Sequence, residues 1–376
     1  MDNSAATRSQ KGSPILQIKD LRTYFDTRDG TVRAVNGVSL EVFAGETLCI
    51  VGESGCGKSV TAMTVLGLLP MPPARIESGE ILFEGTDLLK LGEDEMQAIR
   101  GNDISMIFQE PMTSLNPVKK VGEQIAESVR YHLGKTRTAA RRQAGDLLEQ
   151  VGIPEPGRRL DEYPHQLSGG LRQRVVIAAA LACEPRILIA DEPTTSLDVT
   201  VQKHILDLLD DLRAERGMSM ILVTHDLGVV KGRADEIMVM YAGHTMEEAP
   251  TATLFGEMRH PYTEALLETI PKIDTPSHTR LVPIPGRPPE VIEIPNGCPF
   301  APRCRYSINR CLTDRPGLTS QGAGHSCACH APVGTPAGIE ARAANESAGT
   351  TAAGLDMEQF TRKVPVIDFT PPGVEG

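Results

Sequence analysis

A glycine-rich stretch near the start of the chain has the residue types needed to hold phosphate groups. The segment LCIVGESGCGKSVTAMTVL, residues 48–66, begins as an apolar run, turns through GESGCGKS and continues as a helical pattern. Glycines let the backbone bend so that successive N–H groups point at one anion, and the helix start adds its positive dipole end. Lys58 is expected to reach the terminal phosphates, and Ser59 to bind Mg²⁺. The candidate phosphate-binding residues are Gly52, Glu53, Ser54, Gly55, Cys56, Gly57, Lys58, Ser59 and Val60.

A second apolar run ends in two carboxylates. Residues 186–193, RILIADEP, read as a buried strand that runs into Asp191 and Glu192. Ligands of an α/β sheet sit at the carboxyl ends of its strands, so both carboxylates are expected beside the phosphates. Asp191 would hold Mg²⁺ through water, and Glu192 would polarise the attacking water as general base. Taken alone, the run could equally be a strand that enters an acidic turn.

Residues 167–175, LSGGLRQRV, predict a second helix start that binds phosphate. Ser168 can cap the helix, while Gly169 and Gly170 leave its first N–H groups uncovered. One chain does not need two phosphate-binding helix starts for one nucleotide. An ordinary N-capped helix would explain Ser168 but not the other motifs. The stretch resembles the signature motif of ATP-binding cassette (ABC) ATPases, which two such domains exchange across a head-to-tail dimer.

Other motifs occur in the order typical of that family, and the resemblance implies their roles. Phe25 resembles the aromatic that stacks on adenine, with Tyr24 as the alternate, although an aromatic here could also be strand core. Gln109 in MIFQEP resembles the Q-loop glutamine, which contacts Mg²⁺ and lies in the segment that touches the membrane partner. His225 in ILVTHD resembles the switch histidine at the γ-phosphate; a lone histidine there is otherwise a polar strand end.

The resemblance thus implies a complete ATP site with Mg²⁺. Ser196, Leu197 and Asp198 resemble the D-loop. The implied catalytic residues are Lys58, Gln109, Glu192 and His225. The implied Mg²⁺ ligands are Ser59, Gln109 and Asp191. Beyond residues 52–60, the implied ATP-binding residues are Phe25, Gln109, Ser168, Gly169, Gly170, Gln173, Asp191, Asp198 and His225.

Longer stretches narrow the resemblance to one branch. GTDLLKLGEDEMQAIRGNDISMIFQEPMTSLNP and DEPTTSLDVTVQ are similar to the oligopeptide, dipeptide and nickel importers. This implies two transmembrane permease subunits, a second ATPase subunit that is usually a different homologous chain, and an extracytoplasmic binding protein that acts indirectly. The chain carries one set of motifs, so it must pair with another ATPase or with itself.

One departure from the branch lies in the glycine-rich turn itself. Cys56 stands where serine is commoner. Backbone amides and Lys58 would favour a thiolate there, so we expect Cys56 to be alkylated readily and ATP to protect it.

A cysteine-rich segment follows the ATPase motifs. RHPYTEALLETIP, residues 259–271, and LVPIPGRPPEV resemble the C-terminal extension of peptide-importer ATPases. Such a small, proline-rich module needs a staple, and its cysteines could provide one: Cys298, Cys304, Cys311, Cys327 and Cys329. In a reducing compartment a cluster like this is more often metal-binding than disulfide-bonded.

Spacing alone is compatible with more than one type of metal. Four thiolates suit a [4Fe-4S] cluster, whereas the lack of CxxC pairs weakens Zn²⁺ without excluding it, and unliganded thiols are the third alternative. The resemblance implies iron–sulfur ligation by Cys298, Cys304, Cys311 and Cys329. Cys327, where the branch usually has a small apolar residue, is the alternate fourth ligand.

Composition limits the location and the partners. The net charge of -11 and pI near 5.4 argue against a nucleic-acid binder. The sequence shows neither a secretory signal nor a run long enough to cross a bilayer, so we expect a peripheral protein on the cytoplasmic face of the membrane.

The expected organisation has four parts. They are a disordered tail at 1–13, a nucleotide-binding domain at 14–258 with a helical subdomain at about 110–165, a C-terminal cysteine domain at 259–332, and a mostly disordered tail at 333–376. The final VPVIDF, 364–369, could dock as an edge strand or fray.

The fold class is α/β. The resemblance implies a RecA-like α/β core with an antiparallel β subdomain and an α-helical subdomain, plus the small metal-binding extension. The expected function is ATP hydrolysis that powers uptake of peptides or a related small solute. The alternatives are a soluble ABC ATPase that acts on nucleic acid or ribosomes, and an ATP-dependent redox or scaffold module; the substrate itself is not encoded in this chain.

Overall fold

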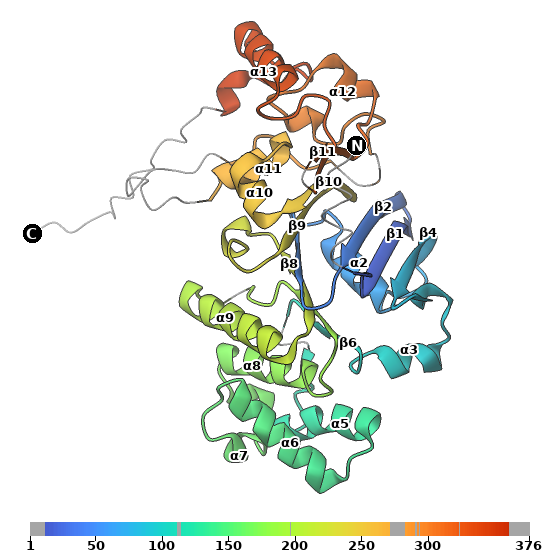
Figure 1. The fold of residues 1–376 in the computed structure, drawn as a ribbon, viewed down its shortest axis with the longest axis vertical. Coiled ribbons are helices and arrows are strands. Elements are labelled where there is room, and N and C mark those ends of the chain that lie inside the picture. The colour runs from blue at the N-terminus through green and yellow to red at the C-terminus, as the bar shows by residue number, and fades with distance from the viewer. Residues whose placement is uncertain are drawn as a thin grey trace, which may run out of the picture.

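The computed structural model describes residues 12–110, 114–195, 197–270, 283–289, 292, 294–322 and 324–360. Figure 1 shows a central sheet, with a smaller sheet on one side and helices on the other. The strands are β1 (Leu16–Thr27), β2 (Gly30–Val42), β3 (Thr47–Val51), β4 (Ala74–Phe83), β5 (Thr86–Asp87), β6 (Ile104–Ile107), β7 (Ile187–Asp191), β8 (Ser219–Thr224), β9 (Glu236–Tyr241), β10 (His244–Pro250), β11 (Thr319–Gly322) and β12 (His325–Cys327). The helices are α2 (Lys58–Val65), α3 (Glu93–Ile99), α5 (Val121–Leu133), α6 (Arg137–Gln150), α7 (Pro156–Arg159), α8 (Gly169–Ala180), α9 (Val199–Arg216), α10 (Thr251–Glu257), α11 (Pro261–Glu268), α12 (Asn309–Thr313) and α13 (Pro336–Ala348). The short 3-10 turns are η1 (Leu88–Lys90), η2 (Pro164–Gln166), η3 (Leu227–Val229), η4 (Ala301–Arg303) and η5 (Met357–Phe360).

The central sheet places the predicted site. Within the described residues its strand order is β11-β12-β10-β9-β3-β8-β7-β6, and β3, β6, β7, β8 and β9 run parallel. Every residue of those five strands is buried. Continuous apolar strands are typical of a parallel sheet covered on both faces, because neither face meets water. The expected α/β core is therefore confirmed.

Alternate residues of β3 divide the core into two layers. Cys49 and Val51 pack into the layer that also contains buried residues of α5, α6, α8 and α9. Leu48 and Ile50 pack into the layer with α2 and the smaller antiparallel sheet, whose order is β2-β1-β4-β5. This alternation follows from the two-residue period of a strand. The carboxyl ends of β3, β7 and β8 consequently lie together at one edge.

Residues 114–165 contain helices α5, α6 and α7, in agreement with the helical pattern of this segment. Its helices α5, α6 and α7 form the lower part of Figure 1. Gly134 ends α5 at a positive φ of 60°, and the Thr136 side chain caps α6 by accepting from Ala139 N–H. Both are ordinary helix boundary signals, so local sequence suffices to place this hairpin of helices.

The C-terminal segment is not a separate body with its own sheet. Strand β12 pairs antiparallel with β10, joining Glu247 to Cys327, and β11 pairs with β12. The central sheet therefore continues directly into the cysteine-rich segment. The Glu247 carboxylate, fully buried, accepts from the N–H groups of Arg259 and His260, and His325 Nε2 lies 2.7 Å from it.

The prediction of disorder from residue 333 onward is wrong for residues 336–348. They form α13, which starts at Pro336 behind the capping side chain of Thr335 and ends at Gly349 with a φ of 73°. Asn345 on this helix is buried and donates to the carbonyls of Arg305 and Ser307. The alanine content that suggested a linker is also the strongest helix-forming composition. The VPVIDF stretch lies outside the described residues.

In the part of the chain that the structure describes, no helix has both the length and the apolar character required to cross a bilayer.

Candidate functional site

The turn between β3 and α2 is closed tightly around its glycines. Gly57, the residue before α2, has a φ of 104°, and a Cβ there would lie 2.2 Å from the Ala34 carbonyl oxygen. A Cβ on Gly52 would lie 2.2 Å from the Met240 carbonyl oxygen. Both positions exclude every side chain, since real contacts of this kind stay beyond 3 Å. The turn is thus shaped by backbone contacts with β2 and β9.

Lys58 and Ser59 open α2 and face polar groups. Lys58 is 4% exposed, and its ammonium donates to the carbonyls of Gly52 at 2.7 Å and Glu53 at 3.1 Å. Ser59 Oγ donates to Asp191 Oδ1 at 3.0 Å. Burial raises the pKa of Asp191, and the nearby Glu192 raises it further, while the hydrogen bond from Ser59 opposes both. A hydroxyl and a carboxylate side by side are hard oxygen ligands, which is the donor set Mg²⁺ prefers.

Three side chains converge on one oxygen of Glu192. Gln109 Nε2 donates to Glu192 Oε2 at 3.2 Å, Thr195 Oγ1 donates at 2.9 Å, and His225 Nδ1 lies 3.1 Å away. Glu192 itself has a φ of 44°, a left-handed conformation that costs a non-glycine residue about 1 kcal/mol or more. This turn aims the carboxylate across the ends of β7 and β8. Sequence reasoning missed Thr195, because a threonine in a turn has no signature of its own.

Lys58, Ser59, Gln109 and Glu192 line one cavity of about 270 Å³, whereas Asp191, Thr195 and His225 contact these residues from outside its wall. Its wall contains Phe25, Val32, Ala34, Ser54, Gly55, Gly57, Lys58, Ser59, Val60, Gln109 and Glu192. Tyr24, the alternate aromatic, is absent from this wall, and its hydroxyl donates to Asn36 at 2.9 Å. An aromatic ring, a phosphate-binding turn and a carboxylate with its hydrogen-bond donors together can hold a nucleotide and orient water at its terminal phosphate.

The residues at the start of α8 lie elsewhere. The Ser168 hydroxyl accepts from Leu171 N–H at 3.4 Å, as a helix cap does, and Gly169 and Gly170 follow. None of them lines the cavity beside Lys58. Gln173 is 1% exposed on α8, and its Nε2 has no hydrogen-bond partner among the described residues. Asp198 caps α9 by accepting from Val201 N–H at 2.9 Å, whereas Ser196 lies outside the described residues.

Cys56 corrects one sequence-based hypothesis. Its side chain is 4% exposed, with the Lys58 ammonium 3.9 Å from its sulfur. Burial raises the pKa of Cys56, and the attraction of Lys58 only partly offsets this. Burial and the raised pKa therefore argue against the expected reactive thiolate, because the sequence shows the neighbouring cation but not the burial.

The C-terminal cysteines lie in one buried region. Cys298, Cys304, Cys311 and Cys327 are buried, and Cys329 is partly so. Burial raises the pKa of Cys304 well above its usual value, and the neighbouring thiols of Cys329, Cys298 and Cys311 raise it further. For Cys327, burial and then Glu247 raise the pKa. Across the described ranges, no set of three or more His, Cys, Asp or Glu side chains is arranged to hold a metal ion.

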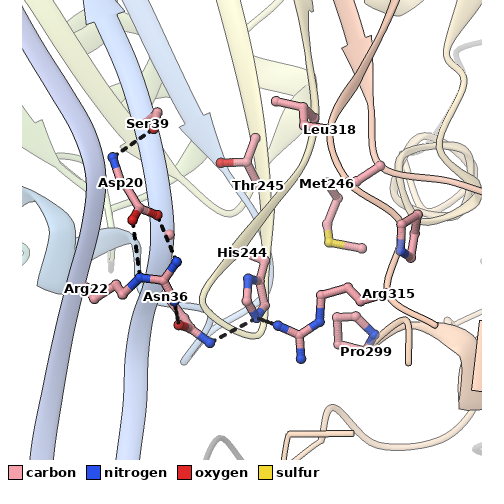
Figure 2. Close-up of a pocket in the computed structure, with 14 residues that line it drawn as sticks. Asp20, Arg22, Asn36, Ser39, His244, Thr245, Met246, Pro299, Arg315 and Leu318 are labelled. Carbon is pink, nitrogen blue, oxygen red and sulfur yellow. Dashed lines mark hydrogen bonds and ion pairs between the residues drawn. The ribbon is translucent and has the colours of Figure 1, made fainter. Parts of the chain in front are cut away.

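A second cavity lies between the antiparallel sheet and the C-terminal segment. It has a volume of about 340 Å³, and Figure 2 shows Arg22 on β1 and Arg315 on opposite sides of it. Between them a hydrogen-bonded row joins Asn36, His244 and Arg315, with Arg315 Nη1 2.8 Å from His244 Nε2. Burial and then Arg315 lower the pKa of His244 to about 4, so the ring is neutral. This cavity contains none of the predicted ATP-binding residues.

The nucleotide-binding part of the chain is similar to known ATP-binding cassettes. Residues 35–195 match the family model described as ABC transporter. A dimeric ATP-binding cassette solved in a post-hydrolysis state with ADP and phosphate is 28% identical, with a TM-score of 0.57 over 63% of this chain and 98% of that one. CbiO1 from Clostridium perfringens, part of an ABC transporter complex, has a TM-score of 0.55 at 28% identity over 65% of this chain and 92% of that one. Fold and site together define an ABC-type ATPase.

The branch follows from closer relatives. Residues 246–311 match the model of the oligopeptide/dipeptide transporter C-terminal region. The dipeptide transport ATP-binding protein DppD of Bacillus subtilis is 50% identical over 315 residues, 84% of this chain and 94% of that one. The oligopeptide transport ATP-binding protein OppD of the same organism is 51% identical over 294 residues, 78% and 82% of the two chains. The chain belongs to the oligopeptide/dipeptide branch of the ABC transporter ATPases, as its motifs predicted.

Proposed function

We propose that this chain binds and hydrolyses ATP as a subunit of an importer that takes up peptides. The observation that carries the proposal is the single cavity lined by Phe25, Lys58, Ser59, Gln109 and Glu192. DppD and OppD, which are about half identical to this chain over most of its length, are ATP-binding proteins of dipeptide and oligopeptide transport. The residues that line the cavity suit a nucleotide with Mg²⁺, and both relatives are named as ATP-binding proteins, so ATP is the proposed ligand.

The residues divide the work of hydrolysis between them. Lys58, which donates to two carbonyls of its own turn, is close enough to exchange them for terminal phosphate oxygens. Ser59 and Asp191 would hold Mg²⁺, with Gln109 as a further ligand, and the bound ion neutralises phosphate charge. Glu192 orients a water and accepts its proton, while Gln109, Thr195 and His225 fix its carboxylate.

The site is completed by a second cassette. Ser168 and Gly170 lie outside the cavity of their own chain, which supports their use in the site of a partner ATPase. Gln173, at 1% exposure, is buried in its own chain and gains no such support. A related cassette has been solved as a dimer with hydrolysis products. We infer that closure and reopening of two cassettes drive two permease subunits through the segment that contains Gln109, on the cytoplasmic face of the membrane. An extracytoplasmic binding protein would select the peptide.

The C-terminal cysteines remain a proposed iron–sulfur site in residues 259–332. In its support, Cys298, Cys304 and Cys311 are buried and Cys329 is partly so, and the thiols of Cys329, Cys298 and Cys311 raise the pKa of Cys304. Protonated thiols in such a low-dielectric region are weak ligands, and binding of a cluster would remove their protons. Cys327 stands beside Glu247 across the β10–β12 ladder, which disfavours it as the fourth ligand. Zn²⁺ on the same thiols is the alternative.

Two measurements test these proposals. ATP hydrolysis by the chain reconstituted with permeases and a partner ATPase should rise when binding protein and peptide are added; a transporter that responds to no peptide would refute peptide import.

In the second measurement, iron, sulfide and zinc are measured in anaerobically purified wild type, Cys298→Ser, Cys327→Ser and Cys329→Ser. About four irons and four sulfides, lost with Cys298 and Cys329 but kept with Cys327, are expected; stoichiometric zinc or no metal would refute the cluster.

A further inference from the structure

An arginine of the cysteine-rich segment binds the phosphate-binding turn directly. Arg303 ends η4, one residue before Cys304, and its side chain is 3% exposed. Its guanidinium donates to both carboxylate oxygens of Glu53, from Nη1 at 2.5 Å to Oε2 and from Nη2 at 3.0 Å to Oε1. Glu53 is the residue after Gly52 in the turn, 250 positions earlier in the chain. A two-bond contact of this kind fixes orientation as well as distance.

The remaining donors of Arg303 are also used, which fixes its position. Nη1 donates to the Tyr241 hydroxyl at 3.0 Å, Nε to the Pro285 carbonyl at 2.9 Å, and Nη2 to the Ile284 carbonyl at 3.3 Å. A guanidinium with all these partners cannot shift without breaking several hydrogen bonds at once. Arg303 is therefore a rigid support rather than a surface charge that happens to meet Glu53.

A second residue holds the same point of the turn. The Tyr262 hydroxyl, on α11, accepts from the backbone N–H of Glu53 at 2.8 Å. The Tyr262 ring is fully buried and packs against Tyr241 and Phe300, with ring centroids 4.6 and 5.2 Å apart. Both the side chain and the backbone of Glu53 are thus anchored by residues that follow position 258. We call Arg303 and Tyr262 the turn clamp.

The clamp acts next to the groups that would bind ATP. The carbonyl of Glu53 accepts from Lys58 at 3.1 Å, and the two residues after Glu53, Ser54 and Gly55, line the nucleotide cavity. Anion binding in such a turn needs successive N–H groups to point at the same place. Glu53 is the residue of this turn that Arg303 and Tyr262 bind, and it therefore connects the turn to the cysteine-rich segment.

We propose that Arg303 is a positioning residue for ATP binding, through which the cysteine-rich segment holds the phosphate-binding turn in its competent shape. The inference rests on the proposed ATPase function. When the competent conformation is only fractionally populated, the apparent dissociation constant rises by the inverse of that fraction. If release from Glu53 lowers the competent population to about one tenth, the apparent affinity for ATP falls about tenfold, while turnover of the bound state is retained.

The experiment measures equilibrium binding of MgATP to the purified full-length chain, and KM and kcat in the reconstituted transporter. The variants are Arg303→Met, Arg303→Lys and Tyr262→Phe, with thermal unfolding recorded for each. Arg305→Met is the matched control: Arg305 lies two residues away, is 13% exposed and pairs with Glu264 and Glu268 within its own segment. Tyr262→Phe keeps the buried ring and removes only the acceptor for Glu53 N–H.

We expect Arg303→Met to raise the Kd and the KM for ATP about tenfold with kcat within twofold of wild type. Arg303→Lys keeps the charge but not the paired geometry, so it should recover part of the affinity. Tyr262→Phe should weaken ATP binding several-fold, which keeps the inference testable even where Arg303→Met fails to fold. Arg305→Met should lower thermal stability without changing the Kd.

Specific outcomes would overturn the inference. Unchanged ATP affinity in folded Arg303→Met or Tyr262→Phe would show that the clamp does not position the turn. Equal loss of affinity in Arg305→Met would show a general effect of segment stability instead. A double variant, Arg303→Met with Glu53→Gln, should bind ATP no more weakly than Arg303→Met alone, because both changes break the same contact. If the loss of affinity in the double variant equals the product of the two single losses, the two residues act independently and the inference is contradicted. Failure of the wild-type chain to bind ATP would overturn the proposed function itself.

Discussion

Replacing Glu192 by glutamine separates ATP binding from hydrolysis. The substitution preserves shape, and the amide oxygen can take the place of Oε2, which faces Gln109, Thr195 and His225. What it removes is the negative charge 4.0 Å from the Lys58 ammonium, in a pair whose side chains are 4% and 10% exposed. The folded structure should therefore persist while the proton acceptor is lost.

The expected size follows from that chemistry. General base catalysis contributes about 10²- to 10⁴-fold, so kcat should fall by that factor, equivalent to about 3 to 5 kcal/mol in activation free energy. At an effective dielectric constant near 20, two unit charges 4 Å apart attract by about 4 kcal/mol before solvation is counted. Loss of this attraction frees Lys58 for phosphate, so ATP should bind at least as tightly as in wild type.

Single-turnover hydrolysis of radiolabelled ATP, with bound nucleotide counted after desalting, measures both quantities. We expect ATP to remain bound and uncleaved. Glu215→Gln, on the exposed side of α9, is the matched control and should behave as wild type. A Glu192→Gln chain that turns over within tenfold of wild type, or that binds ATP more weakly, would refute the assigned role of this carboxylate.

Three shorter predictions follow from burial and backbone geometry. Gly57→Ala should weaken ATP binding more than tenfold by isothermal calorimetry, because its Cβ would lie 2.2 Å from the Ala34 carbonyl oxygen; binding as in wild type would contradict the tight turn. Maleimide should label Cys56 more slowly than a model thiol, as followed by mass spectrometry, because burial raises its pKa; rapid labelling would disprove this. The unfolded chain protonates His244 near pH 6.5 and the folded chain near pH 4, so stability is full above pH 6.5 and falls by roughly 3 kcal/mol toward pH 4. In urea unfolding, the free energy of unfolding of His244→Gln should depend less on pH between 6.5 and 4 than that of wild type. An unchanged pH dependence would contradict the assigned role of His244.

The parts of the fold that local sequence encodes were predictable. The strand, turn and helix around Lys58 follow from glycine spacing and an apolar run, and α5 and α6 follow from helical period and caps. Family resemblance places Gln109 and His225 in one ATP site, but it does not predict that both contact the Glu192 carboxylate. Gln109 is 83 positions and His225 is 33 positions from Glu192, so no local sequence pattern shows that both contact its Oε2.

Long-range contacts account for the errors and omissions. The reactivity expected of Cys56 rests on nearby charges, whereas a sequence does not show how deeply a thiol is buried. The pairing of β12 with β10, and that of Arg303 with Glu53, join segments far apart in sequence, so no local window contains either contact. The helix α13 departs from the expected linker for a different reason: Thr335 caps the alanine-rich stretch that follows it, and composition alone does not show this local signal.

The continuation of the central sheet into the C-terminal segment has a consequence for synthesis of the chain. His325 is made 78 residues after Glu247, the buried carboxylate to which it bonds. At about 5 to 20 residues per second, translation takes roughly 4 to 16 s to span that interval. Throughout it, β10 has an unpaired outer edge, a form of strand prone to pairing with other chains. The ATPase core of this protein therefore cannot complete its own sheet on the ribosome until the last strand of the cysteine-rich segment has emerged.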